Sequence, residues 1–156
     1  TALLSTICYQ KNIKLIYIST DYVFSGNQGN YAETDELLPQ NKYAWSKLGG
    51  EAAVQMLDNY VIIRLSFGPD IFPYKAAFKD QFTSREKAST IVEKIKKIAL
   101  SNFTGVIHIG EERKSVFEYA KSIGALEVEA ISIHDMSVKM PVDTSLNTSL
   151  YKRIFN

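Results

Sequence analysis

Three short runs of apolar, largely β-branched residues constrain the fold of this chain most strongly. They are "IKLIYIS" at 13–19, "YVIIRLSFG" at 60–68 and "GVIHIG" at 105–110. Continuous apolar runs of this length, without regular alternation with polar residues, are typical of strands buried on both faces of a parallel sheet. Segments with a helical repeat separate the runs, so we predict an α/β protein.

The segments around these runs repeat apolar residues at intervals of three and four, which predicts helices. Residues 69–86 hold two prolines and four aromatic residues in an irregular pattern, and we expect a loop and a short helix there. The predicted fold class is therefore a partial Rossmann-like, doubly wound parallel sheet with flanking helices and C-terminal substrate-binding elements. Helices are expected over 1–12, 42–59, 87–102 and 115–124, and a last strand over 128–133.

Length and charge narrow the class of protein. The 156 residues are enough for one domain with a single core. With 18 basic and 17 acidic side chains, neither nucleic acid nor an anionic membrane is expected as the main partner. Apolar runs are too short to span a membrane. The single cysteine, Cys8, excludes an internal disulfide and a multi-cysteine metal site, so we expect no metal and a cytoplasmic location.

Candidate catalytic side chains follow the first strand and begin the next helix. Ser19 and Thr20 open "STDYVFSG", and Tyr43 and Lys47 lie four residues apart in "YAWSK". Parallel sheets bind ligands beyond the carboxyl ends of their strands. A phenol beside an ammonium can transfer a proton. Each feature alone also fits a simpler role, because hydroxyls form turns and caps, and residues four apart share a helix surface.

Together, these motifs resemble the extended short-chain dehydrogenase/reductases that act on nucleotide-linked sugars. The resemblance rests on "YISTDYVFSG", "YAETD", "LPQNKYAWSKLGGE" and "VIIRLSFGP", which follow one another in the order and spacing of the dTDP-4-dehydrorhamnose reductase branch. It is dense over residues 13–69 and thinner afterwards. It implies a reductase or epimerase that reduces a sugar keto group with NADP or NAD and serves polysaccharide biosynthesis.

The resemblance also implies residue roles. Tyr43 would be the acid/base residue, Lys47 its partner and a ligand of the nicotinamide ribose, and Thr20, with Ser19 beside it, the hydroxyl that holds the substrate carbonyl. A hydride that reaches a ketone carbon leaves an alkoxide, which a tyrosine can protonate while a hydroxyl stabilises it. The remaining candidates are Ser66 and Phe67 for the cofactor, and Asp21, Tyr22, Phe24 and Arg85 for the substrate.

One part of the family pattern is missing. None of the eight glycines forms a glycine-rich turn between a strand and a helix, although such a turn lets the backbone approach a cofactor pyrophosphate. We therefore expect residues 1–156 to be one domain, the C-terminal part of an extended reductase. Within it, 1–68 would be the catalytic Rossmann segment and 69–156 the substrate-binding remainder. An exposed sheet edge should make the isolated chain inactive, or make it pair with another copy or with the missing half.

Alternatives stay open at this point. A non-catalytic relative, such as the regulatory subunit of methionine adenosyltransferase, keeps the fold and has a binding or regulatory role. A gene remnant would fold without any function. Ser84 and Arg85 stand where the branch usually has Pro-Thr, so the sugar could differ from dehydrorhamnose. Several other polar residues are expected to have structural roles: His108 in the core, His134 on the surface, Glu33 and Asp35 in a solvated loop, and Lys152 and Arg153 as solvated charges.

Overall fold

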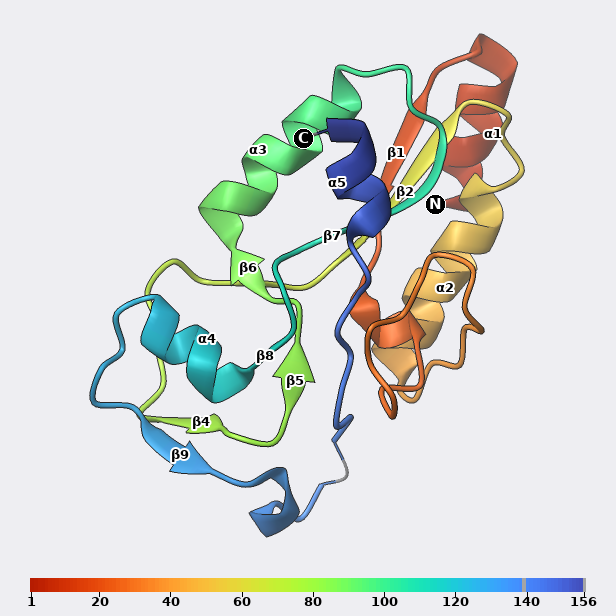
Figure 1. Ribbon diagram of the computed structural model, residues 1–156. Helices are drawn as coiled ribbons and strands as arrows, with labels where there is room; N and C mark the ends of the chain where they lie inside the picture. The colour runs from red at the N-terminus through yellow and green to blue at the C-terminus, as the bar shows by residue number, and fades with distance from the viewer. Residues whose placement is uncertain (139, 156) are drawn as a thin grey trace.

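A three-stranded parallel sheet forms the centre of the computed structural model, which describes residues 1–138 and 140–155. Its strands are β1 (Leu15–Ile18), β2 (Tyr60–Leu65) and β7 (Gly105–Ile109), in the order β1-β2-β7. Ile18 pairs with Ile63, and Ile63 pairs with Ile107. The parallel α/β class is thus confirmed, and the ends of β1 and β2 are brought to one edge of the sheet (Figure 1).

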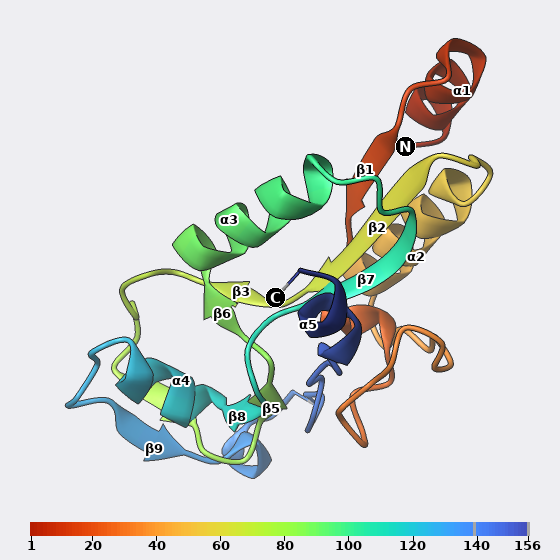
Figure 2. The same cartoon turned by 45° about the horizontal axis from the view of Figure 1, so that its top comes forward.

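Helices cover both faces of this sheet because successive residues of β2 point in opposite directions. Val61, Ile63 and Leu65 pack with Ile91 of α3 (Ala88–Ala99) and Tyr151 of α5 (Ser149–Phe155). On the other face, Arg64 reaches Glu51 of α2 (Lys42–Val54), and α1 (Ala2–Lys11) lies against α2. Figure 2 shows α3 and α5 on one side of the strands and α2 on the other.

A second group of short elements lies beyond the carboxyl end of the sheet (Figure 1). Helix α4 (Val116–Ser122) packs on a two-stranded parallel sheet of β4 (Ala76–Phe78) and β9 (Glu129–Ile131). Ser115 and Glu118 form a capping box at the start of α4. The remaining short elements are η1 (Asp21–Val23), η2 (Ile133–Asp135), β3 (Phe67–Gly68) paired with β6 (Glu86–Lys87), and β5 (Phe82–Thr83) paired with β8 (Lys114–Ser115).

The structure corrects several predicted elements. Residues 69–86 form three short strands, β4, β5 and β6, and no helix. Helix α2 ends at Val54 instead of 59, and the last predicted strand, β9, pairs with β4 outside the central sheet. Helix α5 was not predicted. Although it comes from the end of the chain, it completes the core of the central sheet together with β7.

Strand β1 is an edge strand within the described part of the chain. It pairs with β2 on one side only, and its four residues are half-buried. Nearby α1 exposes large apolar side chains, including Leu3, Leu4 and Tyr9. The expected apolar sheet edge is therefore present.

Gly50 gives a test of how α2 is seated on the sheet. A Cβ atom at Gly50 would lie 2.1 Å from the hydroxyl and 2.4 Å from Cζ of Tyr17, whereas one at Gly49 would meet nothing within 4 Å. We expect Gly50→Ala to lower the free energy of unfolding by about 1–3 kcal/mol, because the ring must move. Gly49→Ala should raise it by about 0.5–1 kcal/mol through helix propensity. Urea unfolding of both variants measures the contrast, and equal effects would contradict this packing.

Candidate functional site

A hollow of about 170 Å³ lies at the carboxyl ends of β1 and β2. Residues 19–22, which follow β1, line it together with Tyr43 from the first turn of α2. Ser66 and Phe67, which follow β2, and Arg85 complete the predicted residues in its wall. We call this the strand-end hollow. It brings together eight of the ten residues singled out from the sequence, because parallel strands end at the same edge.

Tyr43 is positioned by the start of α2. The side chain of Asn41 accepts a hydrogen bond from the amide of Ala44 at 2.8 Å and so caps the helix. Tyr43 is 55% exposed, so its phenol is open to a ligand entering the hollow.

Lys47 does not line the strand-end hollow. Its ammonium donates to the carbonyl of Ile18 at 2.5 Å and lies 4.8 Å from the ring centre of Tyr17. The hydroxyl of Tyr17 in turn donates to the carbonyl oxygen of Lys47 at 3.3 Å. Tyr17 and the carbonyl of Ile18 therefore hold the ammonium at the carboxyl end of β1.

The Thr20 hydroxyl is already engaged. Thr20 Oγ1 donates to Asp21 Oδ1 at 3.1 Å, and Thr144 Oγ1 donates to Asp21 Oδ2 at 2.6 Å. Burial raises the pKa of the Asp21 carboxyl above its ordinary value, while both hydroxyls oppose that shift. Asp21 thus joins the strand-end hollow to the distant segment around Thr144, a contact that the sequence did not indicate.

Arg85 lies between two hollows. It lines the strand-end hollow and also a mainly apolar hollow of about 400 Å³ that Phe72, Tyr74 and Phe78 help to form. Its guanidinium carbon is 5.9 Å from the ring centre of Tyr119. Its Nε is buried, and no residue of the described chain accepts a hydrogen bond from it. An uncommitted donor at this place suits an anionic group of a ligand.

Phe24 is placed away from the hollow, contrary to its predicted contact with substrate. It is 1% exposed and stacks on Tyr31 at 4.4 Å between ring centres. Because its ring is apolar, Phe24 packs in the core directly after η1. Its position within the motif was therefore not enough to predict where its side chain lies.

A buried polar network, which the sequence reading missed, runs from the hollow into the core. Ser19 donates its hydroxyl proton to Glu51, and Arg64 donates to the same carboxylate from Nη2 at 2.8 Å. Arg64 Nη1 also reaches the carbonyl of Glu33 and Nε2 of His108. The signal was present in "VIIRLSF", because an arginine inside a buried strand needs a carboxylate partner.

One further expectation about a polar residue needs correction. The Glu33 carboxylate accepts a hydrogen bond from the amide of His108 at 3.0 Å, so it is not only a solvated loop charge. Lys152 of α5 is exposed, as expected, and it forms an ion pair with Glu112 at the surface. The expected core position of His108 is confirmed, since its side chain is fully buried.

His108 should make stability depend on pH. Burial, with a smaller contribution from the charge of Arg64, lowers its pKa to about 3. An unfolded histidine binds a proton near pH 6.5. Between these values the unfolded chain holds more protons, so the free energy of unfolding should fall as pH drops below about 6.5, by roughly 2 kcal/mol at pH 5.

Urea unfolding at pH 7 and pH 5 measures this loss. His108→Gln should remove most of the pH dependence, whereas His134→Gln, at an exposed position, should keep it. An unchanged pH dependence in His108→Gln would show that another group is responsible.

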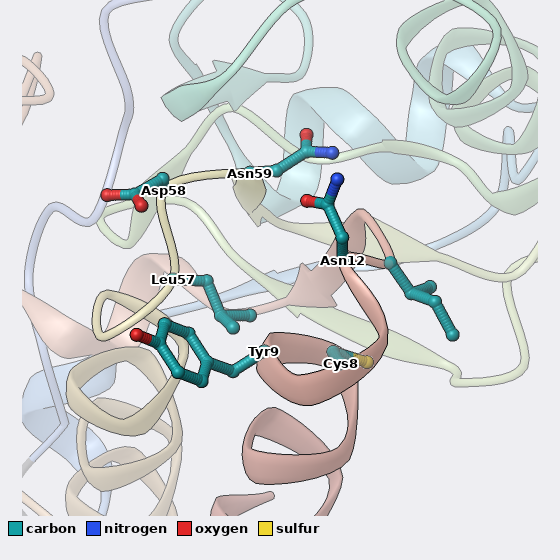
Figure 3. Close-up of a pocket in the computed structure, with 7 residues that line it drawn as sticks. Cys8, Tyr9, Asn12, Leu57, Asp58 and Asn59 are labelled. Atoms are coloured by element: carbon teal, nitrogen blue, oxygen red, sulfur yellow. The ribbon is translucent and has the colours of Figure 1, made fainter.

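A smaller hollow of about 80 Å³ lies at the opposite ends of β1 and β2. Figure 3 shows Cys8, Tyr9 and Asn12 on the α1 side and Leu57, Asp58 and Asn59 on the other. It holds none of the predicted site residues. Within residues 1–138 and 140–155 no group of three or more potential metal ligands gathers, and no helix is long and apolar enough to cross a membrane.

Comparison with known proteins finds similarity to sugar-nucleotide reductases in the first part of the chain. Residues 1–70 match the family described as the RmlD substrate binding domain. The dTDP-4-dehydrorhamnose reductase of Mycobacterium tuberculosis is 48% identical over 56 residues, which are 33% of this chain and 18% of that protein. The β subunit of methionine adenosyltransferase 2 from Danio rerio is 55% identical over 40 residues, which are 26% of this chain and 12% of that protein.

Solved structures extend the likeness to almost the whole chain. A hypothetical dTDP-4-dehydrorhamnose reductase from Sulfolobus tokodaii superposes with a TM-score of 0.85 at 28% identity, over 99% of this chain and 63% of the other. The reductase of Bacillus anthracis, solved in complex with NADP, gives 0.82 at 24% identity, over 97% and 62%.

The chain thus spans less than two thirds of the length of these reductases and less than a quarter of the curated proteins. These matches confirm the resemblance found in the sequence: residues 1–70 are similar to the RmlD substrate binding domain family, and the described part of the chain has the fold of the dTDP-4-dehydrorhamnose reductases.

Proposed function

We propose that this chain is the catalytic and substrate-binding part of an NAD(P)-dependent reductase of a nucleotide-linked sugar, with dTDP-4-dehydrorhamnose as the first substrate to test. The observation that carries the proposal is the strand-end hollow, where Thr20, Tyr43 and Arg85 meet. The lone buried cysteine, Cys8, fits a reducing compartment, so we place the reaction in the cytoplasm.

The residues present fit one end of the cofactor. Tyr43 offers an exposed phenol, and Lys47 an ammonium at the end of β1, so these two would hold the nicotinamide ribose. The chain has no glycine-rich turn for the pyrophosphate, which a preceding segment or a partner would have to supply. When bound, NADPH or NADH supplies the hydride.

The protein's part in the reaction follows from the hollow. Tyr43 donates its phenolic proton to the sugar oxygen as negative charge develops there. Thr20 lies in the same wall, and its hydroxyl turns from Asp21 to the substrate oxygen in this scheme. Arg85 binds the diphosphate, with the nucleoside extending into the aromatic hollow beyond it.

Ligand binding by the chain itself tests the substrate half of the proposal. In titration calorimetry we expect dTDP-rhamnose to bind, and Arg85→Ala to weaken binding by about tenfold or more, because a charged hydrogen bond to the diphosphate is lost. Arg153→Ala is the matched control, since Arg153 is an exposed arginine of α5. Equal affinities in the two variants would contradict the role of Arg85.

The reaction itself requires a cofactor-binding half. We would join the part of the Sulfolobus tokodaii reductase that precedes its region of similarity to Thr1 of this chain, and follow NADPH oxidation with dTDP-4-dehydrorhamnose. This fusion is called the chimaera below. Turnover is the expected result. A folded chimaera that binds NADPH and dTDP-rhamnose without turnover would overturn the proposed reaction.

The match to the methionine adenosyltransferase subunit supports a second candidate, a binding subunit with a reductase fold. Its 40 matched residues cover about a quarter of this chain, less than the reductase match does. Under this alternative the chimaera would bind cofactor but show no turnover.

A further inference from the structure

The strand-end hollow is lined by the hydroxyl of Ser19, which donates its proton away from the hollow to a buried carboxylate. This hydroxyl donates a hydrogen bond to Oε1 of Glu51, which does not itself line the hollow. Arg64 holds the same carboxylate with two groups, Nη2 to Oε2 at 2.8 Å and Nε to Oε1 at 3.1 Å. All three side chains are at most 3% exposed.

The donor and acceptor capacities of these side chains determine where each proton in this group lies. An arginine can only donate, and a carboxylate can only accept. Arg64 Nη1 lies 3.5 Å from Nε2 of His108, whose Nδ1 faces the carbonyl of Tyr31 at 3.1 Å. The histidine therefore carries its proton on Nδ1 and accepts at Nε2. Ser19 must then give its single proton to Glu51, which leaves only lone pairs of Ser19 to face the hollow.

Stability alone gives little reason for such a group. A buried ion pair can often be replaced by apolar side chains of similar size without loss of stability. Arg64 is also in contact with an apolar group, since its guanidinium carbon lies 5.3 Å from the ring centre of Phe24. What apolar side chains could not provide is a fixed direction for the Ser19 hydroxyl.

We propose that Glu51 and Arg64 are positioning residues that fix Ser19 as a hydrogen-bond acceptor in the strand-end hollow, so that this point selects a hydroxyl of the sugar and disfavours a carbonyl or phosphate oxygen. The identity of the ligand rests on the proposed function. The direction of the Ser19 proton does not, because it depends only on contacts within this chain.

The direction is tested on the chain without ligand. With uniform ¹³C labelling, the carboxyl carbon of Glu51 should show a deuterium isotope shift when Ser19 exchanges its hydroxyl proton, and Ser19→Ala should abolish the part due to Ser19. Arg64→Lys keeps a charge beside Glu51 and should keep the shift even if the fold is less stable. A shift that is the same in Ser19→Ala would overturn the proposal.

The acceptor role is tested with dTDP-rhamnose as the probe. We expect Ser19→Ala to weaken its binding by about tenfold, and Glu51→Met with Arg64→Leu to weaken it similarly, because the freed hydroxyl turns its proton into the hollow. Combining all three changes should add little, since they remove one interaction. Additive losses, or wild-type affinity in the Glu51→Met/Arg64→Leu variant, would overturn this role.

If the paired variant fails to fold, Arg64→Lys takes its place as the decisive comparison. It should retain most of the affinity that Ser19→Ala loses, and a loss of affinity as large as that of Ser19→Ala, with the isotope shift retained, would overturn the acceptor role. If the wild-type chain does not bind dTDP-rhamnose, the proposed function fails, while the isotope shift still decides the direction of Ser19.

Discussion

Replacing Tyr43 with phenylalanine in the chimaera is expected to lower kcat roughly 10²- to 10⁴-fold, the usual contribution of a positioned proton donor. The change removes only the hydroxyl of an exposed side chain, so folding should be unaffected. KM for the nucleotide sugar should change little, because Arg85 and the aromatic hollow still bind the nucleotide end. Steady-state NADPH oxidation at varied substrate concentration measures both constants.

Tyr9→Phe is the matched control for this prediction. Tyr9 is also exposed, but it lies on α1 (Figure 3) and lines the small hollow at the other ends of β1 and β2. Removal of the Tyr9 hydroxyl should leave kcat and KM unchanged. If Tyr43→Phe kept more than about a tenth of the activity, another group would be the proton donor, and the simpler view of Tyr43 as a helix surface residue would gain support.

The parts of the fold that could be predicted have strong local signals. Each of the three central strands is a mainly apolar run, interrupted only by Arg64 in β2 and His108 in β7, and α3 carries an amphipathic repeat that buries Ile91 and Ile98. The apolar repeat alone does not fix the buried face of α3, since Val92 next to Ile91 is 57% exposed. The meeting of Ser19 and Ser66 followed from the rule that parallel strands end together.

What was missed depends on contacts between distant segments. The two- and three-residue strands β4, β5 and β6 are too short to show a repeat, and they form only by pairing with β9, β8 and β3. Helix α5 has seven residues, and its burial comes from packing against β7. Likewise, the contact between Thr144 and Asp21 joins residues 123 positions apart, which no local pattern indicates.

Arg64→Ala is expected to lower the free energy of unfolding by about 3–5 kcal/mol, because it leaves the carboxylate of Glu51 buried without its partner. Both side chains are at most 2% exposed in the structure, so water cannot replace the lost contacts. Urea unfolding at neutral pH measures the loss. For comparison, Lys152→Ala breaks an ion pair between exposed side chains, and it should cost less than about 1 kcal/mol.

The paired variant Glu51→Met with Arg64→Leu separates the cost of burying an unpaired carboxylate from the loss of the other contacts of Arg64. Because it removes both charges, it should regain most of the stability that Arg64→Ala loses. A paired variant as unstable as Arg64→Ala would mean that the wider network, with the Glu33 carbonyl and His108 also bound to Arg64, stabilises the fold directly. Regained stability together with lost Ser19-dependent binding would instead mean that the buried charges are kept for the direction that they impose on one hydroxyl.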